Sequence, residues 1–145
     1  MNRLSWCLVL CLFLFACSNE KAGTSARLTS FKGLPPGIEG CSCYFSANEK
    51  EFKNERYLFV CDMDSSAWIA VNKKQVMLKL VRSTKDQTDS SSYEETYSNG
   101  LYTLVIDVTA EENTGDEVWW NTGKIKLFFK ETEVDSSVFS GECGC

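Results

Sequence analysis

The stretch Ser98-Asn-Gly-Leu-Tyr-Thr-Leu-Val-Ile-Asp-Val108 decides the fold. Its apolar side chains recur at every second position: Tyr102, Leu104, Ile106 and Val108. This is the period of a strand with one buried face, and Thr103 and Asp107 lie on the opposite face. The dipeptide Asn99-Gly100 precedes the strand and is a strong hairpin signal, because both residues accept the positive φ angles of a tight turn. The stretch therefore predicts an antiparallel hairpin.

The same alternation recurs along the chain. We predict strands near 41–46, 55–61, 67–71, 75–82, 93–98, 101–108, 117–120, 124–130 and 137–143. Turns are expected at 72–74 and at Asn121-Thr122-Gly123, and a single helical turn between Ala47 and Arg56. The prediction is an all-β fold, an antiparallel meander of about eight or nine strands that forms a small barrel or sandwich. With eight strands the first and last run antiparallel, and with nine they run parallel.

The N-terminus carries a motif of a different kind. Leu14-Phe-Ala-Cys17 ends a short apolar run that begins after Arg3, and it resembles the lipobox of bacterial lipoproteins. The run is shorter than the roughly 20 apolar residues that cross a bilayer. The resemblance implies cleavage before Cys17 and lipid attachment to its sulfur. Ser18 is similar to the residue at this position in outer-membrane lipoproteins, which would place the domain in the periplasm.

This motif predicts a division of the chain into three segments. Residues 1–16 are expected to be the lipoprotein signal peptide, residues 17–37 the lipidated cysteine and a flexible tether, and residues 38–145 the β-domain. The tether is small and polar and ends in Pro35-Pro36-Gly37. The membrane is therefore an expected partner through the N-terminal lipid.

The composition argues against several classes of function. The formal net charge is −5, which disfavours nucleic acid and suits a basic envelope protein as partner. The chain has no histidine, which removes the Ser-His-Asp and Cys-His nucleophile pairs and every zinc site that uses histidine. We therefore expect neither an enzyme nor a cofactor.

Five of the eight cysteines lie in the β-domain. Cys41 and Cys43 open it, and Cys143 and Cys145 close it. In a strand, residues two apart share a face, so each pair presents two sulfurs together. One interpretation joins the two pairs in two disulfides, which an oxidising compartment favours. The alternative is a site in which four thiolates hold copper or zinc. Cys61 is the unpaired cysteine or a substitute for one of the four.

Two aromatic residues are candidates for partner contact. In a strand one of the adjacent residues Trp119 and Trp120 faces inward and the other outward, and an exposed Trp119 could anchor a partner. The competing interpretation is that Trp120 fills the core while Trp119 covers a loop or a sheet edge. Tyr102 is the other candidate.

Two family resemblances remain. Gly40-Cys-Ser-Cys-Tyr-Phe-Ser46 and Phe139-Ser-Gly-Glu-Cys-Gly-Cys145 resemble the ends of a group of bacterial envelope lipoproteins, and this resemblance implies no activity. Ser98-Asn-Gly-Leu-Tyr102 is loosely similar to a segment of the membrane-bound inhibitors of c-type lysozyme. We expect a lipid-anchored, non-enzymatic binding or structural domain; lysozyme inhibition and soft-metal binding are the alternatives.

Overall fold

Eight antiparallel strands form a closed barrel in the computed structural model, which describes residues 25–85 and 91–145. The barrel strands are β3 (Ser42–Ser46), β5 (Phe59–Cys61), β6 (Ser66–Val71), β7 (Lys74–Ser83), β8 (Tyr93–Ser98), β9 (Tyr102–Gly115), β10 (Val118–Phe129) and β11 (Thr132–Gly144). Each strand pairs with the next along the chain, and β11 pairs with β3 to close the ring. The predicted all-β meander is thereby confirmed, and it is an eight-stranded barrel whose first and last strands run antiparallel.

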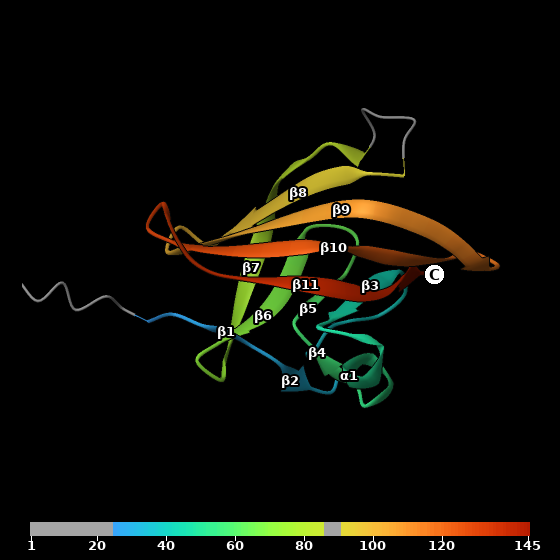
Figure 1. The fold of residues 1–145 in the computed structure, drawn as a ribbon, viewed down its shortest axis with the longest axis horizontal. Coiled ribbons are helices and arrows are strands. Elements are labelled where there is room, and N and C mark those ends of the chain that lie inside the picture. The colour runs from blue at the N-terminus through green and yellow to red at the C-terminus, as the bar shows by residue number, and fades with distance from the viewer. Residues whose placement is uncertain (1–24, 86–90) are drawn as a thin grey trace, which may run out of the picture.

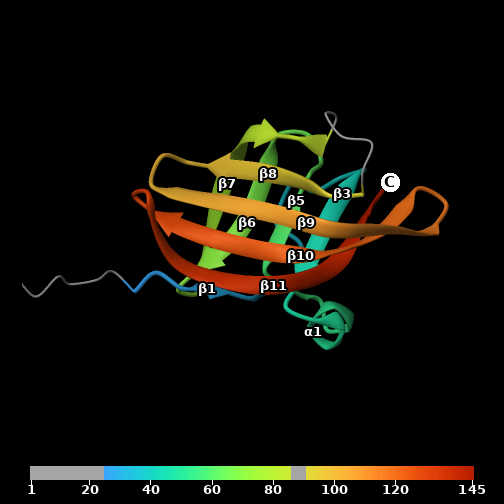
Figure 2. The ribbon, with the colours of Figure 1, turned by 45° about the horizontal axis from the view of Figure 1, so that its top comes forward.

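Short elements surround the barrel. Strand β1 (Leu28–Thr29) pairs with β6, and β2 (Phe31–Lys32) pairs with β4 (Arg56–Tyr57) in a separate two-stranded sheet. Helix α1 (Glu49–Lys53) lies outside the barrel, beside β3 and β4 (Figures 1 and 2). The predicted helical turn is therefore confirmed. Among the described residues, no helix is both long enough and apolar enough to cross a membrane.

The folded part begins earlier than residue 38. Ala26 is fully buried, and the amide of Leu28 donates to Asp135 Oδ2 on β11 at 2.9 Å. The second half of the segment predicted as a tether thus lies against the barrel. The signal peptide, Cys17 and Ser18 lie outside the described residues.

Aromatic and aliphatic side chains fill the barrel. Phe45 stacks between Phe59 and Phe139, with ring centroids 5.4 and 4.3 Å apart. Leu104, Ile106 and Val108 are fully buried, as their alternation predicted. The predicted Asn99-Gly100 hairpin joins β8 to β9, with Gly100 at φ +86° and the Asn99 side chain accepting from two backbone amides.

The predicted turn at Asn121-Thr122-Gly123 is wrong, because β10 runs through it. Asn121 is fully buried, and its amide group donates to the Trp119 carbonyl at 3.0 Å. Gly123 stands where neighbouring chain segments come close: a Cβ there would lie 2.0 Å from the carbonyl oxygen of Asp107. Close approach and a buried amide, not a turn, account for these residues. The β9–β10 turn lies instead at Asp116-Glu117, where Glu117 has φ +56°.

Gly123 gives a test of this packing. In Gly123→Ala the added methyl group would meet the Asp107 carbonyl at 2.0 Å and the Phe139 ring at 2.9 Å. We expect a loss of about 3 kcal/mol in the free energy of unfolding, measured by urea titration. Gly115→Ala is the control, since its nearest neighbour is Val118 at 3.7 Å. Equal stability of the two variants would contradict the close approach.

Candidate functional site

Two disulfides close the barrel at one end. Cys41 bonds to Cys145, and Cys43 bonds to Cys143. Cys43 and Cys143 are directly opposite in the β3–β11 register, so the bridges lie across the seam where the barrel closes. All four sulfurs are therefore oxidised, and a disulfide sulfur is not a thiolate ligand. Within the described ranges, no three His, Cys, Asp or Glu side chains gather as a metal site would require.

Cys61 lies next to this seam. It is a free thiol on β5, and it faces Cys43 on the side away from Cys143. Cys43, Cys61 and Cys143 thus form a row across three strands, and all three side chains are buried. Burial raises the pKa of Cys61 to about 11. At neutral pH the thiol is protonated and is a poor nucleophile.

Cys43 and Cys61 of this row line a pocket of about 270 Å³ at this end of the barrel, here called the mouth pocket. Its buried side includes Cys61, Tyr93 and Tyr97, and Met63 and Asp64 form part of its exposed rim. The β9–β10 hairpin and the C-terminus lie at the same end (Figure 1). Barrel mouths are common places for ligands, because the strands hold side chains rigidly around a hollow.

One carboxylate, that of Glu95, accepts hydrogen bonds from two hydroxyls at the mouth pocket. The Tyr97 hydroxyl donates to Glu95 Oε2 at 2.8 Å, and the Ser83 hydroxyl donates to Glu95 Oε1 at 3.2 Å. Burial first, then the nearby thiol of Cys61 and the carboxylate of Glu95, raise the pKa of Tyr97. The hydroxyl therefore stays neutral and remains a hydrogen-bond donor at physiological pH.

Lys85 is held at the rim by two contacts. Its Nζ lies 3.1 Å from Glu111 Oε1 and 4.6 Å from the centroid of the Tyr93 ring. Burial and then the carboxylates of Glu95 and Glu111 raise the pKa of Tyr93. The pocket therefore combines neutral tyrosine hydroxyls, the hydrogen-bonded carboxylate of Glu95 and, at the rim, the Lys85–Glu111 ion pair. Such groups can hold a ligand by hydrogen bonds.

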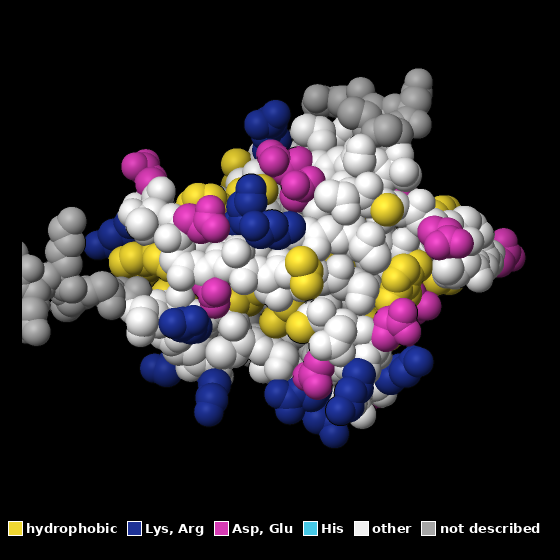
Figure 3. Space-filling model, in the orientation of Figure 1, with side chains coloured by type: hydrophobic (Ala, Val, Ile, Leu, Met, Phe, Trp, Pro, Cys, Tyr) yellow, Lys and Arg dark blue, Asp and Glu magenta, His cyan; other side chains and the backbone are white. Residues whose placement is uncertain are grey.

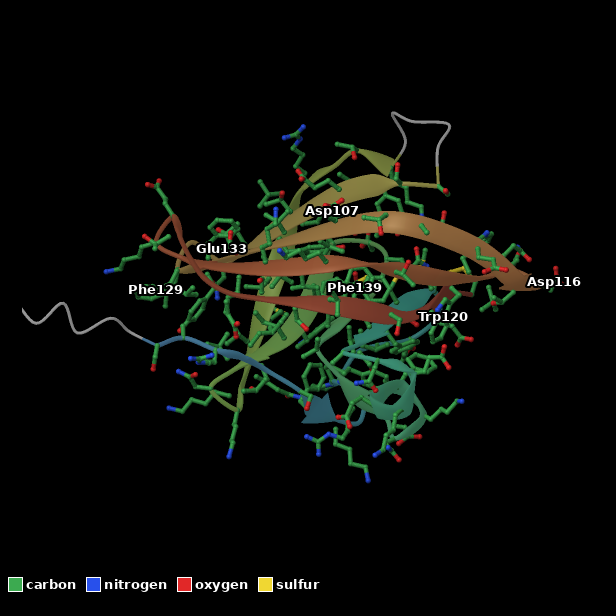
Figure 4. The ribbon with its side chains drawn as sticks, viewed as in Figure 1. Asp107, Asp116, Trp120, Phe129, Glu133 and Phe139 are labelled. Carbon is green, nitrogen blue, oxygen red and sulfur yellow. A yellow bond between two sulfur atoms is a disulfide. The ribbon has the colours of Figure 1, made fainter. Side chains whose placement is uncertain are left out.

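The two candidate contact residues lie apart. Trp119 is half-buried and lines a second hollow of about 420 Å³ together with Met63, Lys85 and Glu111, so it lies at the mouth. Tyr102 lies by the β8–β9 turn and packs against Phe129, with ring centroids 5.6 Å apart. Figure 4 shows Phe129 at the end of the barrel away from Asp116.

Trp120 and Ser98 lie near these two residues in the sequence, and the structure defines the contacts of both. Trp120 is half-buried and packs against Phe52 of α1, with ring centroids 5.1 Å apart, so it covers the outside of the barrel. The interpretation that Trp120 fills the core is therefore wrong. The Ser98 hydroxyl donates to the Tyr102 carbonyl at 3.0 Å, so it stabilises the β8–β9 turn.

Three charged residues of the mouth were not predicted: Lys85, Glu95 and Glu111. They come from separate strands or strand ends, and no spacing in the sequence links them. A signal for Glu95 does exist, since it alternates with Tyr93 and Tyr97 and so shares their inward face. No comparable signal marks Lys85 or Glu111.

Comparison of the chain with protein-family models, with curated proteins and with solved structures finds no match.

The two bridges should stabilise the barrel in a non-additive way. They join residues 104 and 100 positions apart, so either one closes nearly the whole domain. We expect Cys41→Ala/Cys145→Ala to lose about 2 kcal/mol of unfolding free energy, because the other bridge still closes the loop. Removing both bridges should cost a further 4 to 5 kcal/mol, roughly. Urea unfolding without reductant measures both losses, and strictly additive losses would contradict the nested arrangement.

Cys61 should make the barrel less stable at alkaline pH. Its pKa rises from 9.0 to about 11 on folding, so the unfolded chain loses this proton first as the pH rises. The stabilisation is complete below pH 9 and is lost as the pH passes 11, a change of about 2 to 3 kcal/mol. Between pH 8 and pH 11, Cys61→Ala should therefore lose less unfolding free energy than the wild type. Parallel pH profiles for the two proteins would show that this thiol is not the cause.

Proposed function

We propose that this chain is a lipid-anchored binding protein of the bacterial cell envelope, which holds a partner without transforming it chemically. The observation that carries the proposal is the pair of disulfides across the barrel seam. Disulfides persist in oxidising compartments such as the bacterial periplasm. This location agrees with the lipobox-like Leu14-Phe-Ala-Cys17, which would attach the chain to a membrane, with the outer membrane as the expected one.

The mouth pocket supports binding more than catalysis. Glu95 and Glu111 are each engaged by a neighbouring side chain, and burial keeps Cys61 protonated at neutral pH. The chain has no histidine that could serve as a general base. A rigid, stapled barrel presents its side chains with little loss of conformational entropy when a partner binds, and this lowers the cost of binding.

The proposed anchor would keep the barrel near the membrane. The buried residue Ala26 is nine residues beyond Cys17, and an extended chain of that length spans at most about 30 Å. A partner would therefore be met close to the membrane surface. This distance is shorter than the one that a tether reaching Gly37 would allow.

Replacing the lipidated cysteine tests the anchor. In Cys17→Ser the sulfur that would carry the lipid is absent, so the protein should be released from the membrane fraction or remain uncleaved. Membrane fractionation and the mass of the purified chain give the result, with wild type as the reference. A variant that is cleaved normally and stays in the membrane fraction would place the anchor elsewhere.

A further inference from the structure

An aromatic groove with an acidic rim lies on the outside of the barrel, and the mouth pocket does not include it. The hollow measures about 410 Å³ and lies between helix α1 and the strands β9, β10 and β11. Trp120 and Phe52 form its apolar part, with their rings edge to face at 5.1 Å. We call this hollow the outer groove.

The register places two carboxylates beside the indole. Trp120 on β10 is directly opposite Glu112 on β9 and directly opposite Glu142 on β11. Side chains opposite each other on adjacent strands lie on the same face, with Cβ atoms roughly 5 Å apart. The three therefore form a row, Glu112–Trp120–Glu142, and all three line the outer groove.

The two carboxylates of this row have no cationic partner within the described part of the chain. The outer groove also contains Glu49 and Lys53, which pair with each other at 3.9 Å, so the remaining charge comes from Glu112 and Glu142. The field of Glu142 extends to Tyr57, whose pKa is raised by burial first and then by the charges of Glu55 and, more weakly, Glu142. Figure 3 shows acidic side chains beside hydrophobic ones near the end of the molecule that carries the β9–β10 hairpin.

The geometry points to a cation site: the outer groove receives an arginine side chain of a partner protein, stacked on Trp120 between Glu112 and Glu142. A guanidinium group is planar and always charged, and it both stacks on an indole and donates to carboxylates. The unpaired negative charge and the half-buried indole are thus both complemented by one group. The inference rests on the proposed binding role and names the chemistry of its partner.

A fluorescein-labelled hexa-arginine peptide is the probe, and its anisotropy is followed at an ionic strength of about 0.1 M. The protein is the full-length chain, purified in a non-ionic detergent from the cell fraction in which it is found. We expect Glu112→Gln/Glu142→Gln to weaken binding about tenfold or more, because the amides keep the shape of the groove and remove its charge. Trp120→Phe should weaken binding severalfold, and a hexa-lysine peptide should bind less tightly than hexa-arginine to the wild type.

The matched control removes two charges at the other end of the barrel. Glu131→Gln/Glu133→Gln makes the same chemical change on exposed residues, and Figure 4 shows Glu133 far from Trp120. This control should change the affinity less than about twofold, since charges beyond the Debye length of about 10 Å are screened. An equal loss in both double variants would mean attraction by net charge and would overturn the site.

Two other results would also overturn the proposal: no detectable binding of hexa-arginine to the wild type, or binding that is unchanged in Trp120→Phe and equal for hexa-lysine. Because the peptide assay uses the purified chain, it does not depend on where the anchor lies. Failure of the anchor is read from the Cys17→Ser fractionation, so the two outcomes are separable.

Discussion

The pairing of β3 with β11 joins the first barrel strand to the last, and the rest of the barrel depends on it. Without this contact the sheet would have two open edges with unpaired backbone groups. Hydrogen bonds alone would have to hold together segments about 100 residues apart, against the entropy of a large loop. The bridges Cys41–Cys145 and Cys43–Cys143 remove that entropy from the unfolded chain. Closing the seam also sets the position of every inward side chain around the ring.

Strand β9 could be predicted because only one of its faces is buried. Leu104, Ile106 and Val108 alternate with more exposed residues, and a shift of one residue would expose them all. The prediction of a turn at Asn121-Thr122-Gly123 was wrong because Asn and Gly favour turns but also suit sites of close approach or internal hydrogen bonding. The sequence holds no local sign that Asp107 and Phe139 come close to Gly123. Only the closed barrel creates that contact.

The candidate sites were less predictable than the fold, for the same physical reason. Glu112, Trp120 and Glu142 are neighbours through the registers of β9 with β10 and of β10 with β11. Those registers depend on the turns at Asp116-Glu117 and at Lys130-Glu131. A chain with a turn at Asn121-Thr122-Gly123 would not have these registers, so the prediction of that turn excluded the row. The cysteine pairs were an exception, because their positions at the two ends of the domain already indicated that the ends meet.

Inside and outside the barrel, the same residue type has different surroundings. Glu95 in the mouth pocket accepts hydrogen bonds from Tyr97 and Ser83, because a carboxylate withdrawn from water needs replacement partners. Glu112 is exposed and keeps its hydration, so it can remain unpaired at little cost. A cation that enters the outer groove would exchange that water for carboxylate contacts on both sides and an aromatic face below. The interior charges are therefore fixed by folding, whereas the charges beside Trp120 stay available for a partner.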